Sequence, residues 1–381
     1  MHFLYKRREF ITLLGGAAPG WPLAVVMLRY GPALAALLYP LALSALHQSG
    51  QQFLHAPDTA GRLGAGLLLG VAVALVYGVP ALSLAAILKS GRDVLARRLA
   101  HLAFAAPPLF VLIGVLFYML ELPKGDYVAW GIGWLGVLGF AAFAVPGKET
   151  PTAATWIRTA HGFSAAAIVA IFLVWHLANH LTAAWSLQTN KAIMDLLRAW
   201  YRSDVIQPII LALFAFQLLS GLRLLWAKIP RDADVYSSIQ TATGGYLAVY
   251  ITSHLIAVFI LGRIFLAIDT TFAWASGAPT GLLSDPWNVR LIPHYSLAVL
   301  FVISHLAMGA RAILLGHGAL LASANRLAWI ICGIGVAVSL LVTIAQLSVR
   351  EVVDELSAAK PIAAATTQLS QAFCSTLCRG A

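Results

Sequence analysis

The sequence predicts an all-α fold, a polytopic bundle of transmembrane helices. Hydrophobic residues fill 60% of its 381 positions and charged residues only 10%, whereas a soluble chain carries about 25% charged residues. Mean hydropathy is +0.83, and apolar stretches of roughly 20 residues, long enough to cross a bilayer, recur along the chain. The protein therefore belongs in a lipid membrane. Its net charge of +10 does not point to nucleic acid, because basic residues of membrane proteins gather in cytoplasmic loops and contact anionic headgroups.

The chain begins with a basic leader, residues 1–23. Its KRREFITLLGG stretch has paired arginines, a Phe two places on and an apolar run, as in a twin-arginine export signal. No small-x-small cleavage site follows, and the apolar stretch passes through Arg29 into the first span. These features favour an uncleaved leader or an artefact of the start site.

About nine apolar segments follow, separated by loops rich in Pro, Gly and charge. The first four form an N-terminal membrane region, 24–148, to which no chemistry is assigned; the other five form a second region, 156–350. The polar tail, 351–381, is expected to be loosely ordered. More of the 25 Lys and Arg residues flank the side shared with the N-terminus, which predicts a cytoplasmic N-terminus. The predicted spans are 24–46, 63–88, 99–120, 128–146, 160–185, 206–228, 238–263, 293–315 and 327–349.

Three histidines lie well inside apolar segments: His176, His254 and His305. Ionisable residues at such depth are costly and indicate function. His176 and His254 each lie roughly 25 Å above the inner start of helices that rise from the same side, so the two can face one another at one level. Level histidines between helices are what a bis-histidine haem requires. A simpler interpretation is that each histidine hydrogen-bonds a neighbouring helix, but three at depth, two of them level, favour haem.

His305 lies on a descending helix, about 14 Å above its inner end. The residue at the same level on the other descending helix is Gln217. Glutamine is a poor ligand for haem iron, so we expect a second bis-histidine site to be broken. His47, His55 and His101 lie near the ends of spans, where structural or headgroup contacts are expected. Of the cysteines, Cys332 lies in a span and is expected to pack there.

Several short motifs in the second region occur in the order and spacing of a known family. From about 156 to 350 the chain resembles the single-polypeptide, five-helix cytochrome b membrane anchors of succinate dehydrogenase and fumarate reductase. The extra four spans at 24–148 depart from that pattern. The matching stretches are R-x-x-H…FLVWHLANH at 158–180, FQLLSGLRLLW at 216–226, QTATGGYLAVYITSH at 240–254 and SHLAMGAR at 304–311.

The resemblance implies two sites for haem b in the five helices. It assigns His176 and His254 to the outer haem and His305 to one half of the inner haem, while Gln217 stands where the family has histidine. It also implies a quinone near Arg158 and His161, at the inner surface. Asn179 and His180, one turn beyond His176, are candidates for hydrogen bonds to an outer quinone, a haem propionate or interfacial water. Cations expected near the propionates are Arg263, Arg198, Arg202 and Arg290.

The sequence contains no dinucleotide glycine fingerprint, P-loop, iron–sulfur cysteine cluster or HExxH motif. The leading hypothesis is therefore a non-catalytic subunit of a bacterial-type inner membrane, which passes electrons between iron–sulfur and flavoprotein subunits on the cytoplasmic side and the quinone pool. One alternative is a haem-poor structural anchor or sensor derived from the same family. Another is a transporter that relays protons through its histidines, although acidic residues at depth, which such a relay needs, are scarce.

Overall fold

The computed structural model describes residues 23–91, 93–144, 152–231 and 233–358. The predicted leader, apart from its last residue, and the end of the predicted tail lie outside these residues. Within them the chain forms helices and no strand, so the predicted all-α fold is confirmed. Seven helices are long and apolar enough to cross a membrane, or up to 9 spans if each of two bent helix pairs is one span.

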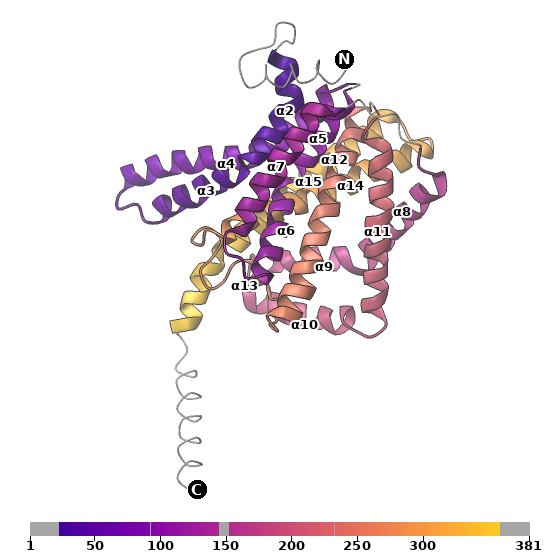
Figure 1. The fold of residues 1–381 in the computed structure, drawn as a ribbon. Helices are drawn as coiled ribbons and strands as arrows, with labels where there is room; N and C mark the ends of the chain where they lie inside the picture. The colour runs from indigo at the N-terminus through magenta and orange to yellow at the C-terminus, as the bar shows by residue number, and fades with distance from the viewer. Residues whose placement is uncertain (1–22, 92, 145–151, 232, 359–381) are drawn as a thin grey trace, which may run out of the picture.

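In the described residues of the N-terminal region there are six helices, and the helices of the second region follow them in the chain (Figure 1). The first six are α2 (Leu23–Leu37), α3 (Tyr39–Leu54), α4 (Thr59–Lys89), α5 (Val94–Phe104), α6 (Ala106–Met119) and α7 (Gly125–Phe143). The second region begins with α8 (Thr155–Ile168), the π-helical turn η1 (Val169–Leu173), α9 (Val174–Thr182), α10 (Leu187–Tyr201) and α11 (Ile206–Lys228). It continues with α12 (Val235–Leu255), the π-helical segment η2 (Ile256–Phe265), α13 (Phe272–Ala275), η3 (Asn288–Arg290), α14 (Leu291–Gly316) and α15 (Leu321–Ala358).

Proline bends two of the predicted spans. The axes of α2 and α3 differ by 52°, and those of α5 and α6 by 57°. Pro40 and Pro107 each occupy the first turn of the second helix of a pair, where the missing N–H costs nothing while the preceding helix cannot continue through them. The predicted spans at 24–46 and 99–120 thus correspond to bent helix pairs, and the predicted nine spans are reached if each pair is one span. Beyond its bend, α3 runs with α4 as a hairpin that projects from the bundle (Figure 1).

Two further boundaries differ from the expectation. α15 continues past 350 to Ala358, so the predicted tail begins as helix. The connection between the first two spans of the second region contains α10, an amphipathic helix that carries Lys191, Asp195 and Arg198. In the view of Figure 1, α10 lies at the lower end of the bundle beside α11, as a helix at a membrane surface can.

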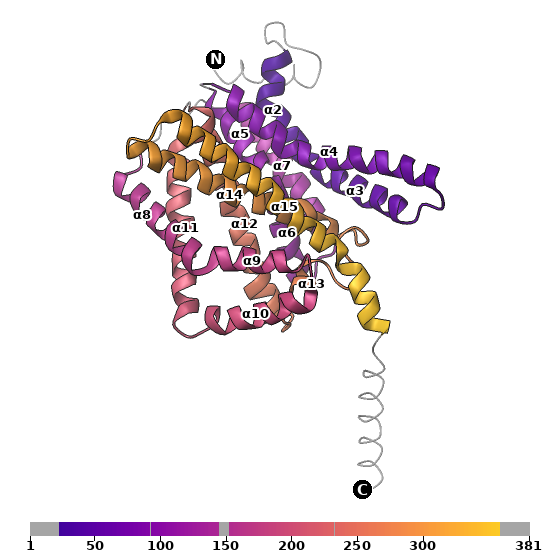
Figure 2. The same cartoon turned by 180° about the vertical axis from the view of Figure 1, so that it is seen from behind.

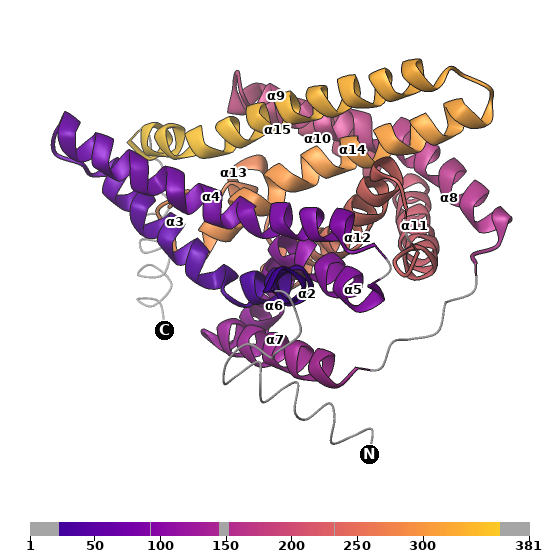
Figure 3. The same cartoon turned by 90° about the horizontal axis from the view of Figure 1, so that it is seen from above.

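The N-terminal and second regions lie side by side (Figure 3) and share one hydrophobic core. Trp130 of α7 and Tyr39 of α3 belong to the same buried cluster as Leu261 and Ile292. A buried ion pair also joins the two regions, with Arg290 Nη1 2.7 Å from Asp126 Oδ2. Arg290 is therefore not a free cation near a haem edge, as the sequence suggested, because its charge is compensated inside the protein. Removing one partner of such a pair costs about 3–5 kcal/mol.

Candidate functional site

A cavity of about 1380 Å³ lies inside the second region, between α8, α9, α11, α12 and α14. Figure 2 shows these helices from the side of α8 and α9. Protein interiors are close-packed, and pockets for drug-sized ligands enclose roughly 300–1,000 Å³. The lining is mostly apolar and runs from Arg158 at one end of the bundle to Arg263 at the other. A space of this size and character suits a large, flat, hydrophobic ligand.

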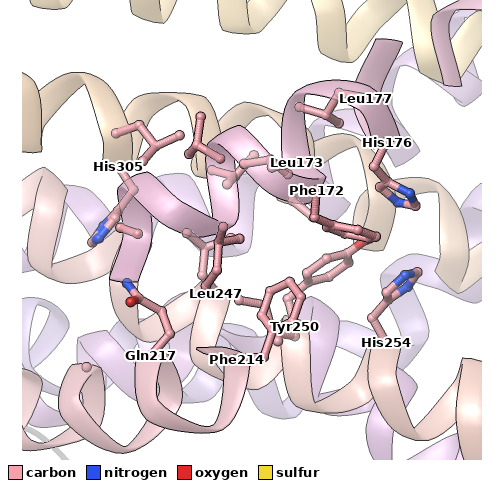
Figure 4. Close-up of a pocket in the computed structure, with 18 of the residues that line it drawn as sticks. Phe172, Leu173, His176, Leu177, Phe214, Gln217, Leu247, Tyr250, His254 and His305 are labelled. Atoms are coloured by element: carbon pink, nitrogen blue, oxygen red, sulfur yellow. The ribbon is translucent and has the colours of Figure 1, made fainter. Parts of the chain in front are cut away.

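His176 and His254 face one another across one end of this cavity (Figure 4). His176 comes from α9 and His254 from α12, and their ring centroids are 6.3 Å apart. A metal–imidazole bond is about 2 Å long, so two such bonds in line separate the ring centres by roughly 6 Å. The two imidazoles thus lie at the separation that a shared metal ion between them requires.

An aromatic side chain one turn earlier orients each of these rings. Phe172 stacks on His176 with ring centroids 4.8 Å apart and planes 21° apart. Tyr250 stacks on His254 with ring centroids 5.6 Å apart and planes 12° apart. Residues four apart share a helix face, so each helix presents its histidine together with a flat support. π-helical segments adjoin both positions, η1 before His176 and η2 after His254, and such segments are frequent at functional sites.

His180 lies against His176 rather than at a distance from it. The two Nε2 atoms are 3.1 Å apart, and the rings meet edge to face. The Nδ1 atom of His180 is buried without a hydrogen-bond partner in the described chain. Binding of a metal ion at His176 Nε2 therefore replaces the hydrogen bond to His180. The backbone carbonyl oxygen of Asn179 instead accepts a hydrogen bond from Asn190 Nδ2 at 2.7 Å.

The opposite end of the cavity contains His305 and Gln217, which Figure 4 places together. His305 Nδ1 is 3.0 Å from the backbone carbonyl oxygen of Gln240. Because a carbonyl only accepts, Nδ1 carries the proton and Nε2 keeps its lone pair, the arrangement that metal-binding histidines commonly have. A Cβ atom on Gly244 would lie 2.9 Å from His305 Cε1, so the glycine leaves room for this ring.

Gln217 itself is held by side chains of α8. Its Nε2 atom is 2.9 Å from His161 Nε2, and its Oε1 atom accepts a hydrogen bond from Ser164. His161 Nδ1 is 2.8 Å from Ser220 Oγ. Both ring nitrogens of His161 are therefore engaged inside the protein, and a quinone carbonyl there would have to replace one of these bonds. Arg158 is exposed at the same end of the cavity.

Cations surround the end of the cavity next to the histidine pair. Arg263 Nη1 donates to Gln207 Oε1 at 3.1 Å. Arg198 forms an ion pair with Asp269, and Arg202 Nη2 lies 3.7 Å from the same carboxylate. Burial, together with the charges of Arg198 and Arg263, lowers the pKa of Arg202. Asp269 is thus the shared ion-pair partner of two guanidinium groups, those of Arg198 and Arg202. An additional anionic group would be stabilised here.

Sequence reasoning missed one buried histidine, His294. It lies at the start of α14, is 2% exposed, and its ring centroid is 4.6 Å from that of Tyr250. Its position near the beginning of a predicted span concealed its burial. The structural contacts expected for His47 and His101 are confirmed: their Nδ1 atoms lie 2.9 Å from the Leu283 carbonyl oxygen and 2.8 Å from the Arg97 carbonyl oxygen, respectively. His55 is exposed and contacts the carbonyl oxygen of Gln51 within its own helix.

In comparisons with known proteins, no family model, curated protein or solved structure matches the chain significantly. The resemblance to the cytochrome b anchors therefore stays a prediction, and the site is interpreted from its own geometry.

Proposed function

We propose that the protein is a membrane cytochrome b, which binds one haem between His176 and His254 and exchanges electrons with a quinone. The observation that carries this proposal is the separation of 6.3 Å between the two ring centroids across a large apolar cavity. Each imidazole would supply one axial bond to the iron.

The number of ligands favours haem over a bare metal ion. In the described part of the chain, no group of three or more His, Cys, Asp and Glu side chains could hold a metal ion. Zinc sites need three or four protein ligands, whereas a haem macrocycle brings four nitrogen ligands of its own and needs only two more. When bound, the haem iron accepts and releases one electron at a time.

The surrounding residues have distinct parts in this proposal. Phe172 and Tyr250 hold the two imidazoles in position through stacking. The mostly apolar lining would pack against the haem macrocycle, and the iron would replace His180 as the partner of His176 Nε2. Arg263 and its neighbours Arg198 and Arg202 line the same cavity and would pair with the anionic propionates.

A soluble partner would supply or accept the electrons. We propose iron–sulfur and flavoprotein subunits that dock on the cytoplasmic side, at the cavity end with the exposed Arg158, in a bacterial-type inner membrane. The cationic side chains of Lys228 and Arg311 line this end as well, which would attract an acidic partner surface. Supporting the need for partners, the sequence has no motif for hydride or group transfer.

Two measurements test the proposal. A reduced-minus-oxidised spectrum of the purified protein should show a low-spin b-type haem, at about one haem per chain by extraction. Purification from native membranes should recover flavin and iron–sulfur centres with the haem protein. Absence of haem from protein produced with ample haem supply would overturn the cytochrome assignment. A haem protein that purifies alone and oxidises quinol unaided would overturn the partner assignment.

A further inference from the structure

A second cavity lies on the boundary between the N-terminal region and the haem-site region. Its volume is about 350 Å³, within the roughly 300–1,000 Å³ typical of small-molecule sites. Val111 and Val115 of α6 form one wall, and residues of η2, α13 and α14 form the others. Within the described lining, α6 is thus the element of the N-terminal region that closes this cavity.

The second cavity adjoins the proposed haem site through shared residues. His254 and Tyr295 line both cavities. A ligand in the second cavity would therefore contact the imidazole that faces His176 across the first. Tyr118 also lines the second cavity and is 51% exposed, so one wall lies at the lipid-facing surface, where a hydrophobic tail could leave.

The polar groups of this cavity select the chemistry of its ligand. No Lys or Arg is among its described lining residues, which disfavours phosphates and carboxylates. Asp285 already accepts from the backbone N–H groups of Trp287 and Asn288, and Asn288 Nδ2 donates to the carbonyls of Gly277 and Gly281. The acid and the amide are thus used to hold the loop.

Hydrogen-bond donors remain without partners. Within the described residues, nothing bonds to the indole N–H groups of Trp274 and Trp287 or to the hydroxyl of Tyr295. His294 lines the cavity and is 2% exposed; its Nδ1 atom is enclosed by protein without a partner, so Nε2 is the ring nitrogen that a ligand in the cavity could contact. Buried polar groups are normally hydrogen-bonded. Donors among aromatic walls suit a flat, neutral ligand with carbonyl acceptors.

We propose that the second cavity binds the head group of a quinone, with His294 and Trp287 as donors to its carbonyl oxygens. This inference rests on the proposed function for its role in electron exchange, although binding itself is measured separately. It places the quinone beside His254 instead of near Arg158 and His161, where the resemblance suggested it. It also gives the N-terminal region a role, since α6 closes the site.

Binding of menadione, a naphthoquinone without an isoprenoid tail, to the purified full-length protein in detergent tests the proposal. Val115→Phe should fill the cavity and weaken binding at least tenfold, while Val128→Phe, on the exposed face of α7 where Val128 is 62% exposed, should leave it unchanged. His294→Leu and Trp287→Phe should each weaken it by about tenfold, as loss of one hydrogen bond does. The last two variants carry the test if Val115→Phe does not fold.

The outcomes separate this inference from the proposed function. Haem at the wild-type level in all variants, with equal menadione affinity in all of them, would overturn the quinone site and leave the cytochrome assignment intact. If the wild-type protein contains no haem but binds menadione, and His294→Leu weakens that binding, the quinone site would be supported and the cytochrome assignment overturned.

Discussion

The two ends of the large cavity each contain a histidine, but only one end pairs it with a second histidine that faces it. At one end, two histidines from α9 and α12 face one another with 6.3 Å between ring centroids. At the other end, His305 is held in a different way, with Nδ1 bonded to a backbone carbonyl and a glycine beside the ring. The residue next to His305 at this end is Gln217 (Figure 4), whose side-chain amide is hydrogen-bonded to His161 and Ser164. The comparison teaches that one end presents two histidines to each other, while at the other end the residue next to the histidine is tied into a polar network.

The cavity itself does not close at the glutamine end. Gln217, Gly244 and His305 all belong to its lining. Each end thus has open space and at least one histidine in the lining. The difference that the variants change is the residue beside that histidine, which is Gln217 at one end and a second histidine at the other. The four variants below act on this difference.

The largest effect is expected from His254→Ala. It removes one of the two axial ligands at the intact end, so haem content should fall from about one per chain to none. Haem extraction and the reduced-minus-oxidised spectrum of the purified variant measure this. His305→Ala is the matched control, because it removes a histidine of the same cavity at the end that lacks a pair, and it should keep the wild-type spectrum. Equal haem in both variants would contradict the assignment of the two ends.

Gln217→His is expected to convert the second end into a site like the first. The new imidazole would lie with His305, and haem content should rise from about one to about two per chain. The same variant leaves His161 and Ser164 without their glutamine partner, so some stability should be lost. An unchanged haem content in a folded variant would show that the side chain is not the only difference between the two ends.

Gly244→Ala, added to Gln217→His, should remove the second haem again. The added Cβ would lie 2.9 Å from His305 Cε1, closer than real contacts of this kind, so the ring would have to turn away. The first haem should stay, because Gly244 lies at the other end. A double variant that still binds about two haems would show that His305 is not the ligand at this end.

The sequence was sufficient for the helices and for the histidine pair. Long apolar segments locate spans because a bilayer demands about 20 such residues, and the rise of 1.5 Å per residue placed His176 and His254 at one level. Gln217 could be recognised in the same way. These features depend on local composition and on regular helix geometry, which a sequence records directly.

Other features depend on contacts between distant segments. Arg290 and Asp126 are 164 positions apart, and each lies near the end of a predicted span, where a charge normally faces water. The packing of η3, which carries Arg290, against α3 and α6 of the N-terminal region buries the two charges as a pair. His294 was concealed for the same reason, because a residue at the start of a span is expected at the surface. The bends at Pro40 and Pro107, by contrast, do have a local signal in the sequence, because proline interrupts the helix that precedes it.

The smallest effect is expected from His180→Leu, which tests which histidine of α9 belongs to the intact end. His180 Nε2 is hydrogen-bonded to His176 Nε2 at 3.1 Å, and both histidines line the large cavity. Either histidine could therefore supply the ligand nitrogen of α9. Figure 4 shows His176 facing His254, and only His176 has the aromatic support of Phe172 one turn earlier in a stacked geometry.

His180→Leu should therefore retain about one haem per chain and change only the position of the spectral bands, since a hydrogen bond near an axial ligand tunes the metal without holding it. His176→Leu, one turn away in the same helix, is the matched control and should lose the haem. Leucine is used in both because it keeps the helix and adds no ligand. If His180→Leu loses the haem and His176→Leu keeps it, the axial ligand of α9 is His180, and the intact end of the cavity is built one turn further along the helix than the ring distances indicate.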